Sequence, residues 1–366
     1  MSRTLGERSD AWLVDHLVDL VVNLAETPAP TFAEEGRARL VTELWREAGL
    51  EPRRDAAGNV VAEVPGGEGP VVLVAAHLDS VFGEGTDVTV RRDGNRLAGA
   101  GVGDDAAGLA LLTAYVQGLP EPRPRLIVAA TVGEEGAGDL RGARQVVADL
   151  KERIDHFVAF DGHLGSICAQ AVGSLRHEVL LSTAGGHSWG DYPSPSAVHA
   201  VGKAIARLAA LPVPKEPRSS LNVGLVWGGT SVNSIAAEAG FALDLRSVDQ
   251  RTLDLLWEAC RAEVEKVAAE TGCGLTVRRV GARPAGVSEN AKLVAAASRA
   301  LAASGIAPSL APASTDANAA MAVGLSAIAL GAYRGGGAHT LSEWVDVESL
   351  PLGLDVLARF LAELAG

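Results

Sequence analysis

Histidine and carboxylate residues follow three predicted strands in the first half of the chain. They are His77 and Asp79 after the apolar run VVLVAA, Glu134 and Glu135 after LIVAAT, and Asp161 after HFVAF. Because the carboxyl ends of parallel strands meet at one edge of an open α/β sheet, we expect these side chains to lie together at a ligand site. Taken singly, each motif also has a simpler interpretation, as a hydrogen-bonded pair, a solvated acidic loop or a turn residue.

A glycine-rich loop at residues 99–108 adds Asp104 and opens a predicted helix. The order Gly101-x-Gly103-x-x-Ala106 loosely matches a dinucleotide-binding fingerprint. Two adjacent carboxylates at the helix N-terminus would repel a pyrophosphate, however, so the loop suits a cation better. The two oxygens of Asp104 allow it to bridge two metal ions.

This density of carboxylates predicts a site for two divalent metal ions. Without a cation, so many acidic groups at one edge would repel one another at high cost. A set rich in oxygen and poor in imidazole suits zinc, or cobalt or manganese, and zinc is favoured by its availability. Near the C-terminus, His339 follows the glycine run 335–337 and supplies a further neutral ligand.

The pattern of apolar residues predicts the elements that position these side chains. Helical and strand patterns alternate over the first 160 residues, with helices at 10–24, 31–48, 105–119 and 142–151 and strands at 71–76, 125–131 and 157–160. The alternation predicts an α/β fold with a mainly parallel sheet flanked by helices.

An inserted module interrupts this pattern. Between about 174 and 281, half-polar strands bracket two helices in the order β-α-β-β-α-β, which predicts an α+β, ferredoxin-like fold. A helix at 290–303, a strand at 327–331 and a helix at 347–364 then resume the first pattern. We predict a discontinuous catalytic domain, 1–173 and 284–366, and an inserted lid or dimerisation domain, 174–283.

Composition excludes several classes of function. The 366 residues carry 32 basic and 45 acidic side chains, a net charge of −13, which argues against binding to nucleic acid or to an anionic membrane. Three cysteines without metal-type spacing fit a reducing compartment. Acidic residues interrupt the N-terminal segment, where a signal peptide needs an apolar stretch, and the longest uncharged run is too short and polar for a membrane span. We expect a cytoplasmic protein.

The order of the motifs resembles that of the zinc aminoacylase/carboxypeptidase superfamily. This superfamily contains tripeptide aminopeptidase, glutamate carboxypeptidase, acetylornithine deacetylase and succinyl-diaminopimelate desuccinylase, and the resemblance covers nearly the whole chain. It implies that His77 and Asp161 bind the first metal ion and that Glu135 and His339 bind the second. It also implies that Asp104 bridges both ions and that a cis peptide follows Asp104.

The resemblance implies further roles in catalysis and substrate binding. Asp79 would orient the first metal-binding histidine, and Glu134 would be the general base that takes a proton from a water bridged by the two metals. In the inserted module, His187 would stabilise the oxyanion, and in dimeric members this histidine reaches the partner's active site. Asn233 would face the substrate, and Arg246 would hold a substrate carboxylate. A surface histidine, a glycine turn and an exposed arginine are the alternative interpretations of these three matches.

Together these features predict a metal-dependent hydrolase that cleaves an amide bond of a short peptide. In the family, an aspartate at the position of Asp161 is common in aminopeptidases and dipeptidases, whereas carboxypeptidases and deacylases often have glutamate. An N-acyl-amino-acid deacylase or carboxypeptidase is the alternative, because Arg246 suits any substrate with a free carboxylate. A non-catalytic binding protein is a third interpretation, which the intact Glu134 opposes. We also expect a homodimer formed through the inserted domain.

Overall fold

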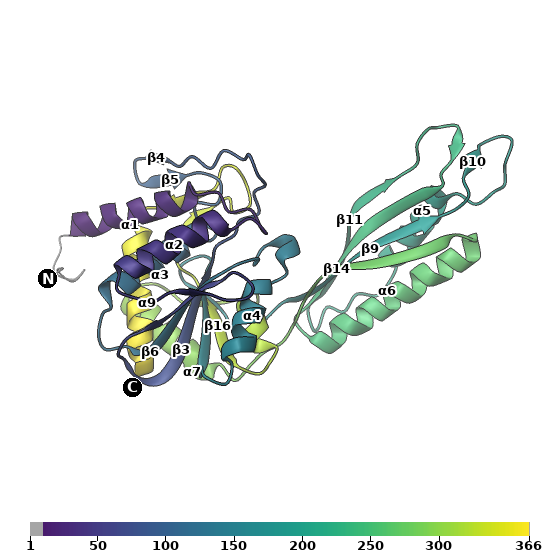
Figure 1. The fold of residues 1–366 in the computed structure, drawn as a ribbon. Coiled ribbons are helices and arrows are strands. Elements are labelled where there is room, and N and C mark those ends of the chain that lie inside the picture. Colours follow the sequence, from purple (N-terminus) through teal and green to yellow (C-terminus); the bar gives the residue numbers. More distant parts are fainter. Residues whose placement is uncertain (1–9, 366) are drawn as a thin grey trace. The chain divides into compact units, whose positions relative to one another are not determined.

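The computed structural model describes residues 10–365 and divides the chain into two compact units (Figure 1). The first unit comprises Met1–Ala171 and Val287–Gly366, and the second comprises Val172–Gly286. Each unit is built around hydrophobic clusters of its own.

A mixed, mainly parallel sheet forms the centre of the first unit. Its strands are β1 (Arg53–Arg54), β2 (Val60–Val64), β3 (Glu68–His77), β6 (Pro124–Thr131), β7 (His156–Phe160), β8 (Ser166–Cys168), β15 (Ser309–Leu310) and β16 (Ser326–Leu330). Among the described residues the strand order is β1-β2-β6-β3-β7-β16-β8-β15. The four central strands β6, β3, β7 and β16 are parallel, while β2 joins β6 in the antiparallel sense.

Helices cover both faces of this sheet. They are α1 (Asp10–Ala25), α2 (Glu35–Glu47), α3 (Ala106–Gly118), α4 (Arg141–Leu150), α7 (Ala291–Ala303), α8 (Ala317–Met321) and α9 (Ser349–Ala365). One hydrophobic cluster joins α1, α2, α3, α7 and α9 to one face, and a second cluster joins α4 and α8 to the opposite face. The predicted α/β architecture is confirmed.

Strand β3 shows how the sequence produces this layering. Val72, Val74 and Ala76 belong to the first cluster, while Leu73 and Ala75 belong to the second. Successive side chains of a strand point to opposite faces, so a strand covered on both faces is an unbroken apolar run. The polar residues that follow the run are therefore the ones that reach the edge of the sheet.

Two local features differ from the prediction. Helix α2 begins at Glu35 rather than at 31, because Phe32 has a positive φ of 76° and the Thr31 hydroxyl donates to Asp79 Oδ2 at 2.8 Å. A small antiparallel sheet was not predicted, because its strands have only two or three residues each. It consists of β4 (Arg91–Asp93), β5 (Arg96–Ala98), β17 (Gly335–Gly336) and β18 (Trp344–Asp346).

The second unit has the predicted order β-α-β-β-α-β. Its main elements are β9 (Gly173–Ser182), α5 (Ala197–Ala209), β11 (Ser219–Gly228), β13 (Glu238–Ser247), α6 (Gln250–Thr271) and β14 (Gly274–Arg283), with the short pair β10 (Gly186–His187) and β12 (Ser234–Ile235). The sheet order is β11-β13-β9-β14, and its pairs are antiparallel. The helices α5 and α6 share one hydrophobic cluster with the sheet. This arrangement matches the predicted ferredoxin-like module.

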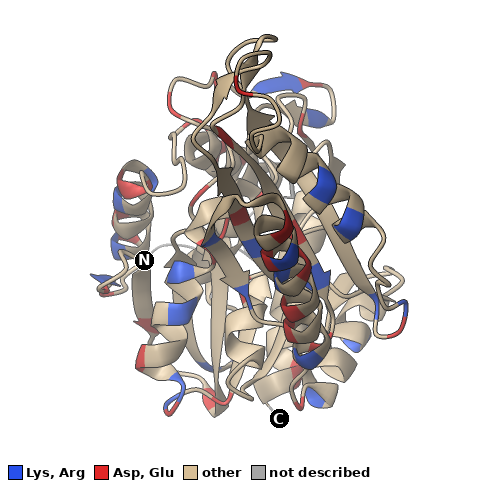
Figure 2. Cartoon of the chain, turned by 90° about the vertical axis from the view of Figure 1, so that its right-hand side faces the viewer, with Lys and Arg blue, Asp and Glu red and all other residues tan. Residues whose placement is uncertain are grey.

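Basic and acidic residues are interspersed along the helices coloured in Figure 2. On the second unit, for example, Glu270 Oε2 forms ion pairs with Lys203 Nζ and Arg207 Nη2, each at 2.7 Å. In the part of the chain that the structure describes, no helix combines the length and the apolar character that crossing a bilayer requires.

Candidate metal centre

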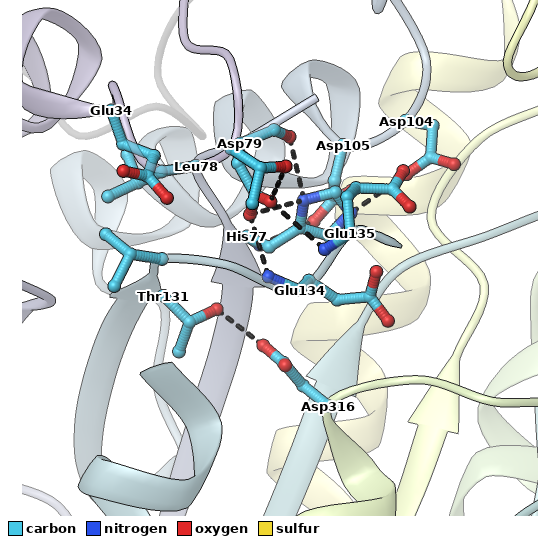
Figure 3. A network of polar contacts seen from close by, with 12 residues as sticks. Glu34, His77, Leu78, Asp79, Asp104, Asp105, Thr131, Glu134, Glu135 and Asp316 are labelled. Atoms are coloured by element: carbon cyan, nitrogen blue, oxygen red, sulfur yellow. Dashed lines mark hydrogen bonds and ion pairs between the residues drawn. The ribbon is translucent and has the colours of Figure 1, made fainter. Parts of the chain in front are cut away.

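The predicted metal ligands come from separate segments of the first unit. They are His77 at the end of β3, Asp104 before α3, Glu135 after β6, Asp161 after β7 and His339 between β17 and β18. His77 Nε2 lies 2.8 Å from Asp104 Oδ1, and His339 Nε2 lies 3.1 Å from Asp104 Oδ2 (Figure 3 labels the first two residues). His339 Nε2 also lies 3.1 Å from Glu135 Oε1.

These side chains form two groups that share Asp104. One ligand atom each from His77, Asp104 and Asp161 lie within 4.8 Å of one another. The same holds, within 4.8 Å, for Asp104, Glu135 and His339. The peptide that follows Asp104 is cis, as the family resemblance implies.

Glu134 borders both groups from the same turn as Glu135. Its carboxylate, with a ligand atom of His77 and one of Glu135, makes a third set within 4.8 Å. Both glutamates are buried, and Gly133 and Gly136 on either side of them have positive φ values of 65° and 47°. Glycine adopts this backbone region at little cost, so the chain can turn here and deliver both carboxylates to one place.

Crowding and burial raise the pKa of two of these carboxyl groups, Asp161 and Glu135. Burial and the charge of Asp104 raise the pKa of Asp161 well above its usual range. Burial and the charges of Asp104 and Glu134 raise the pKa of Glu135 to about 7. Like charges removed from water oppose ionisation, and a divalent cation offsets that repulsion. The donor set of imidazole and carboxylate groups therefore fits two metal ions of the zinc type.

Asp79 connects the end of β3 to the turn that carries the two glutamates. Its Oδ1 accepts the N–H of Glu134 at 2.9 Å, and its Oδ2 accepts the N–H of Glu135 at 3.0 Å (Figure 3). His77 Nδ1 lies 2.9 Å from the Asp79 carbonyl oxygen and 3.6 Å from Asp79 Oδ1. Burial opposes ionisation of Asp79, but His77 and the two N–H groups outweigh it and lower the pKa of Asp79 to about 2. The carboxylate thus fixes the glutamate turn, a role that its position in the sequence does not reveal.

This constellation can be compared with known proteins. A family model described as Peptidase family M20/M25/M40 matches residues 73–363, which is most of the chain. The chain belongs to this family. Membership in this peptidase family confirms the resemblance found in the motifs of this M20-family chain.

Sequence relatives of this M20 chain include hydrolases of several kinds. A candidate LysW-lysine/LysW-ornithine hydrolase of Pyrococcus abyssi is 37% identical over 131 residues, and this stretch spans 36% of each chain, about a third of that relative's length. A candidate succinyl-diaminopimelate desuccinylase DapE of Mycobacterium tuberculosis H37Rv is 28% identical over 305 residues, covering 79% of this chain and 82% of the relative.

Solved structures show the same fold. Aminopeptidase PepT of Bacillus cereus superposes with a TM-score of 0.80 at 22% identity, covering 96% of this chain and 99% of that one. The YXEP protein of Bacillus subtilis, described as a dinuclear metal-binding M20 peptidase, superposes with a TM-score of 0.69 at 20% identity and covers 96% and 98%.

Asp316 lies close to Glu134 of this M20 site and directly precedes α8. Of the two possible caps in the motif Ser-Thr-Asp-Ala-Asn, Thr315 and Asp316, the Asp316 side chain makes no cap hydrogen bond. Its Oδ2 instead accepts the Thr131 hydroxyl at 2.5 Å (Figure 3), and the N–H of Ala317 donates to Thr315 Oγ1 at 3.2 Å. Burial and the charge of Glu134 raise the pKa of Asp316 to about 7.

Arg37 is a buried basic residue behind the site that sequence reasoning missed. Its Nη1 donates to the carbonyl oxygen of Leu78 at 2.7 Å, between His77 and Asp79, and its Nε donates to the carbonyl of Thr27 at 3.1 Å. The signal was present in the helical pattern, because Arg37 falls on the stripe of buried residues of α2. A charged residue on an apolar stripe has to find a partner in the interior.

The three predicted substrate-site residues of the inserted module lie in the second unit. Each makes a hydrogen bond with a residue close to it in the sequence. His187 Nδ1 accepts the N–H of Trp189 at 3.2 Å, Asn233 Oδ1 accepts the Ser231 hydroxyl at 3.0 Å, and Arg246 Nε donates to Asp244 Oδ2 at 2.9 Å. His187 and Asn233 are exposed, and the Arg246 side chain is 40% exposed.

Proposed function

We propose that this M20-family chain hydrolyses an amide bond of a short peptide with the help of two metal ions. The observation that supports the proposal is the pair of ligand groups that share Asp104, with Glu134 beside both. His77 and Asp161 would hold one ion, Glu135 and His339 would hold the other, and Asp104 would be a ligand shared by both. The M20 peptidase of Bacillus subtilis, described as dinuclear, agrees with two ions, and zinc is the ion that we expect.

The chain's own residues carry the proton transfers in this proposal. The ions, when bound, would lower the pKa of a water molecule and polarise the amide carbonyl. Glu134 accepts a proton as the water oxygen bonds to the carbonyl carbon, and it returns a proton to the amine nitrogen as the C–N bond breaks. Asp79 keeps Glu134 in place through its backbone N–H. General-base function requires such a fixed position.

The substrate separates two candidate functions. Asp161, at a position where family peptidases often have aspartate, supports a short peptide as substrate. The names of the sequence relatives instead favour a deacylase, since they include a desuccinylase and an acetylornithine deacetylase of Edwardsiella ictaluri, 26% identical over 229 residues. Arg246 suits a substrate carboxylate in both cases, and Asn233 and His187 would complete the substrate site.

We also propose that the second unit is a lid and dimerisation domain, as we predicted for residues 174–283. Strand β11 lies at the edge of its sheet and pairs only with β13 among the described residues. It exposes Leu225, Val226 and Trp227, whose relative exposures are 66%, 59% and 40%. An exposed apolar edge strand favours pairing with another chain, and a second copy of this protein would provide it. In such a homodimer His187 would act on the partner's substrate.

A substrate panel tests the proposed function. The protein is dialysed against EDTA and then loaded with zinc, cobalt or manganese before it is assayed on dipeptides, tripeptides, N-acetyl amino acids and N-succinyl amino acids. We expect no hydrolysis without metal and hydrolysis of the short peptides after loading. Hydrolysis confined to the acylated amino acids would establish the deacylase instead. A loaded protein that binds these compounds but cleaves none of them would be a binding protein.

A further inference from the structure

Glu343 joins the segment that carries His339 to the loop that carries Asp104. Its side chain is 1% exposed. Oε2 accepts the N–H of Gly101 at 2.9 Å, and Oε1 accepts the N–H of Gly103 at 3.2 Å and of Asp104 at 2.8 Å. The structure gives Glu343 no ion pair with a basic side chain among residues 10–365, so backbone N–H groups alone compensate the buried carboxylate.

The backbone of the same residue adds to this connection. The Glu343 carbonyl oxygen accepts the N–H of Gly99 at 3.0 Å, and the next residue, Trp344, pairs with Ala98 in the small sheet. The loop that leads into Asp104 is therefore held by one residue over its whole length. The side chain accepts three N–H groups and the backbone carbonyl oxygen accepts one, so the carboxyl group makes most of this attachment.

Gly103 shows how closely the loop wraps around the carboxylate. A Cβ atom at this position would lie 2.7 Å from Glu343 Oε1 and 2.5 Å from the hydroxyl oxygen of Tyr333. No side chain fits there without displacing one of the two. A glycine at 103 thus allows the loop to close around Glu343.

The two residues that Glu343 links through the backbone are Asp104 and His339, and their side chains meet in the candidate metal centre. Asp104 presents Oδ1 to His77 and Oδ2 to His339. The His339 side chain is 56% exposed, so surrounding packing does little to fix it. His339 lies in the connection between β17 and β18, and Glu343 directly precedes β18, the return strand of that hairpin.

From this geometry we infer that Glu343 is a positioning residue that sets the distance between the Asp104 carboxylate and His339. The inference rests on the proposed function, since it assumes that both side chains bind metal. Glu343 touches neither of the proposed metal positions and acts through the backbone of the bridging residue. Groups that orient metal ligands typically contribute 10- to 100-fold to metal affinity.

Metal binding by the Glu343→Gln protein tests the inference. A glutamine keeps the shape of the side chain, but only its amide oxygen can accept a hydrogen bond. Its NH₂ group would face a backbone N–H donor of the loop. We expect the affinity for one of two zinc ions, measured by competition with a chelator, to fall by about 10- to 100-fold. The visible absorption spectrum of the cobalt-loaded protein should also change. Glu348→Gln, an exposed glutamate on the same segment, is the control and should match the wild type.

Each result bears on one claim. Wild-type affinity and an unchanged cobalt spectrum in a folded Glu343→Gln protein would overturn the inference and show that Glu343 only stabilises the fold. If this variant does not fold, Glu343→Asp replaces it, and its shorter carboxylate should give an intermediate loss of affinity; wild-type binding there would overturn the inference equally. A wild-type protein that binds neither zinc nor cobalt would instead refute the proposed function.

Discussion

Replacing Asp79 with alanine should release the turn that carries Glu134 and Glu135. The wild-type carboxylate is fully buried and accepts both backbone N–H groups, at 2.9 and 3.0 Å, and the hydroxyl of Thr31 at 2.8 Å. Alanine offers no acceptor, and both N–H groups come from buried residues. The turn must then expose them to water or leave them unpaired.

The size of the effect follows from these two groups. A buried donor without an acceptor costs about 1–3 kcal/mol, so the pair should lower the free energy of unfolding by about 2–6 kcal/mol. Domains of ordinary stability unfold with about 5–15 kcal/mol, so the variant stays folded wherever this loss is smaller than the wild-type free energy of unfolding. Locally, 1–3 kcal/mol for each N–H corresponds to amide exchange that is faster by about 5- to 150-fold.

Hydrogen exchange followed by mass spectrometry measures this directly in the peptide that spans residues 132–138, and urea unfolding in EDTA measures the global change. Asp19→Ala, at an exposed position of α1, is the matched control and should behave as the wild type. Wild-type exchange in residues 132–138, together with a free energy of unfolding within about 0.5 kcal/mol of the wild type, would refute the reasoning.

Three further predictions concern the base, a buried histidine and the dimer. Glu134→Ala should keep nearly wild-type metal content while kcat falls by about 100- to 10,000-fold, and substantial retained activity would exclude Glu134 as the base. His177 stacks on Trp257 at 3.5 Å, and burial together with Arg279 lowers its pKa to about 4. Below pH 6.5 the unfolded chain takes up this proton, whereas the folded chain takes it up only near pH 4. The free energy of unfolding should therefore fall by about 2–3 kcal/mol as the pH is lowered from 6.5 to 4. His177→Phe should reduce that loss in melts followed by tryptophan fluorescence; an equal pH dependence in both proteins would contradict it. Leu225→Lys should convert a dimer into monomers by light scattering, and a wild-type monomer at micromolar concentration would exclude the dimer.

The sequence predicts the central sheet, and the proximity of the side chains at its edge, for one physical reason. Strands buried on both faces are unbroken apolar runs, and the first polar residues after them must reach the edge of the sheet. His77 and Asp161 follow such runs directly, so their neighbourhood could be inferred without coordinates. Asp104 and His339 lie on loops, and only the order of the motifs indicated that they belong to the same site.

Contacts that depend on distant segments could not be predicted in this way. Glu343 bonds to residues about 240 positions earlier in the chain, and nothing in its local sequence distinguishes it from an exposed glutamate. Asp79 looks like a partner for His77, whereas its carboxylate also fixes the glutamate turn, which is a tertiary contact across two strands. Helix α2 was predicted too long, because the bond from Thr31 to Asp79 holds the preceding residues in a turn.

The central claim is that two metal ions bound by this site support amide hydrolysis. Its most direct test is a titration of the metal-free protein with zinc, in which bound metal and hydrolysis of a short peptide or N-acyl amino acid are measured together. We expect no hydrolysis at zero zinc and a rise that saturates at two bound ions per chain. Full hydrolysis by the metal-free protein would contradict this expectation. Saturation at two bound zinc ions in a variant that lacks both His77 and His339 would also contradict it, because the zinc would then bind outside the site.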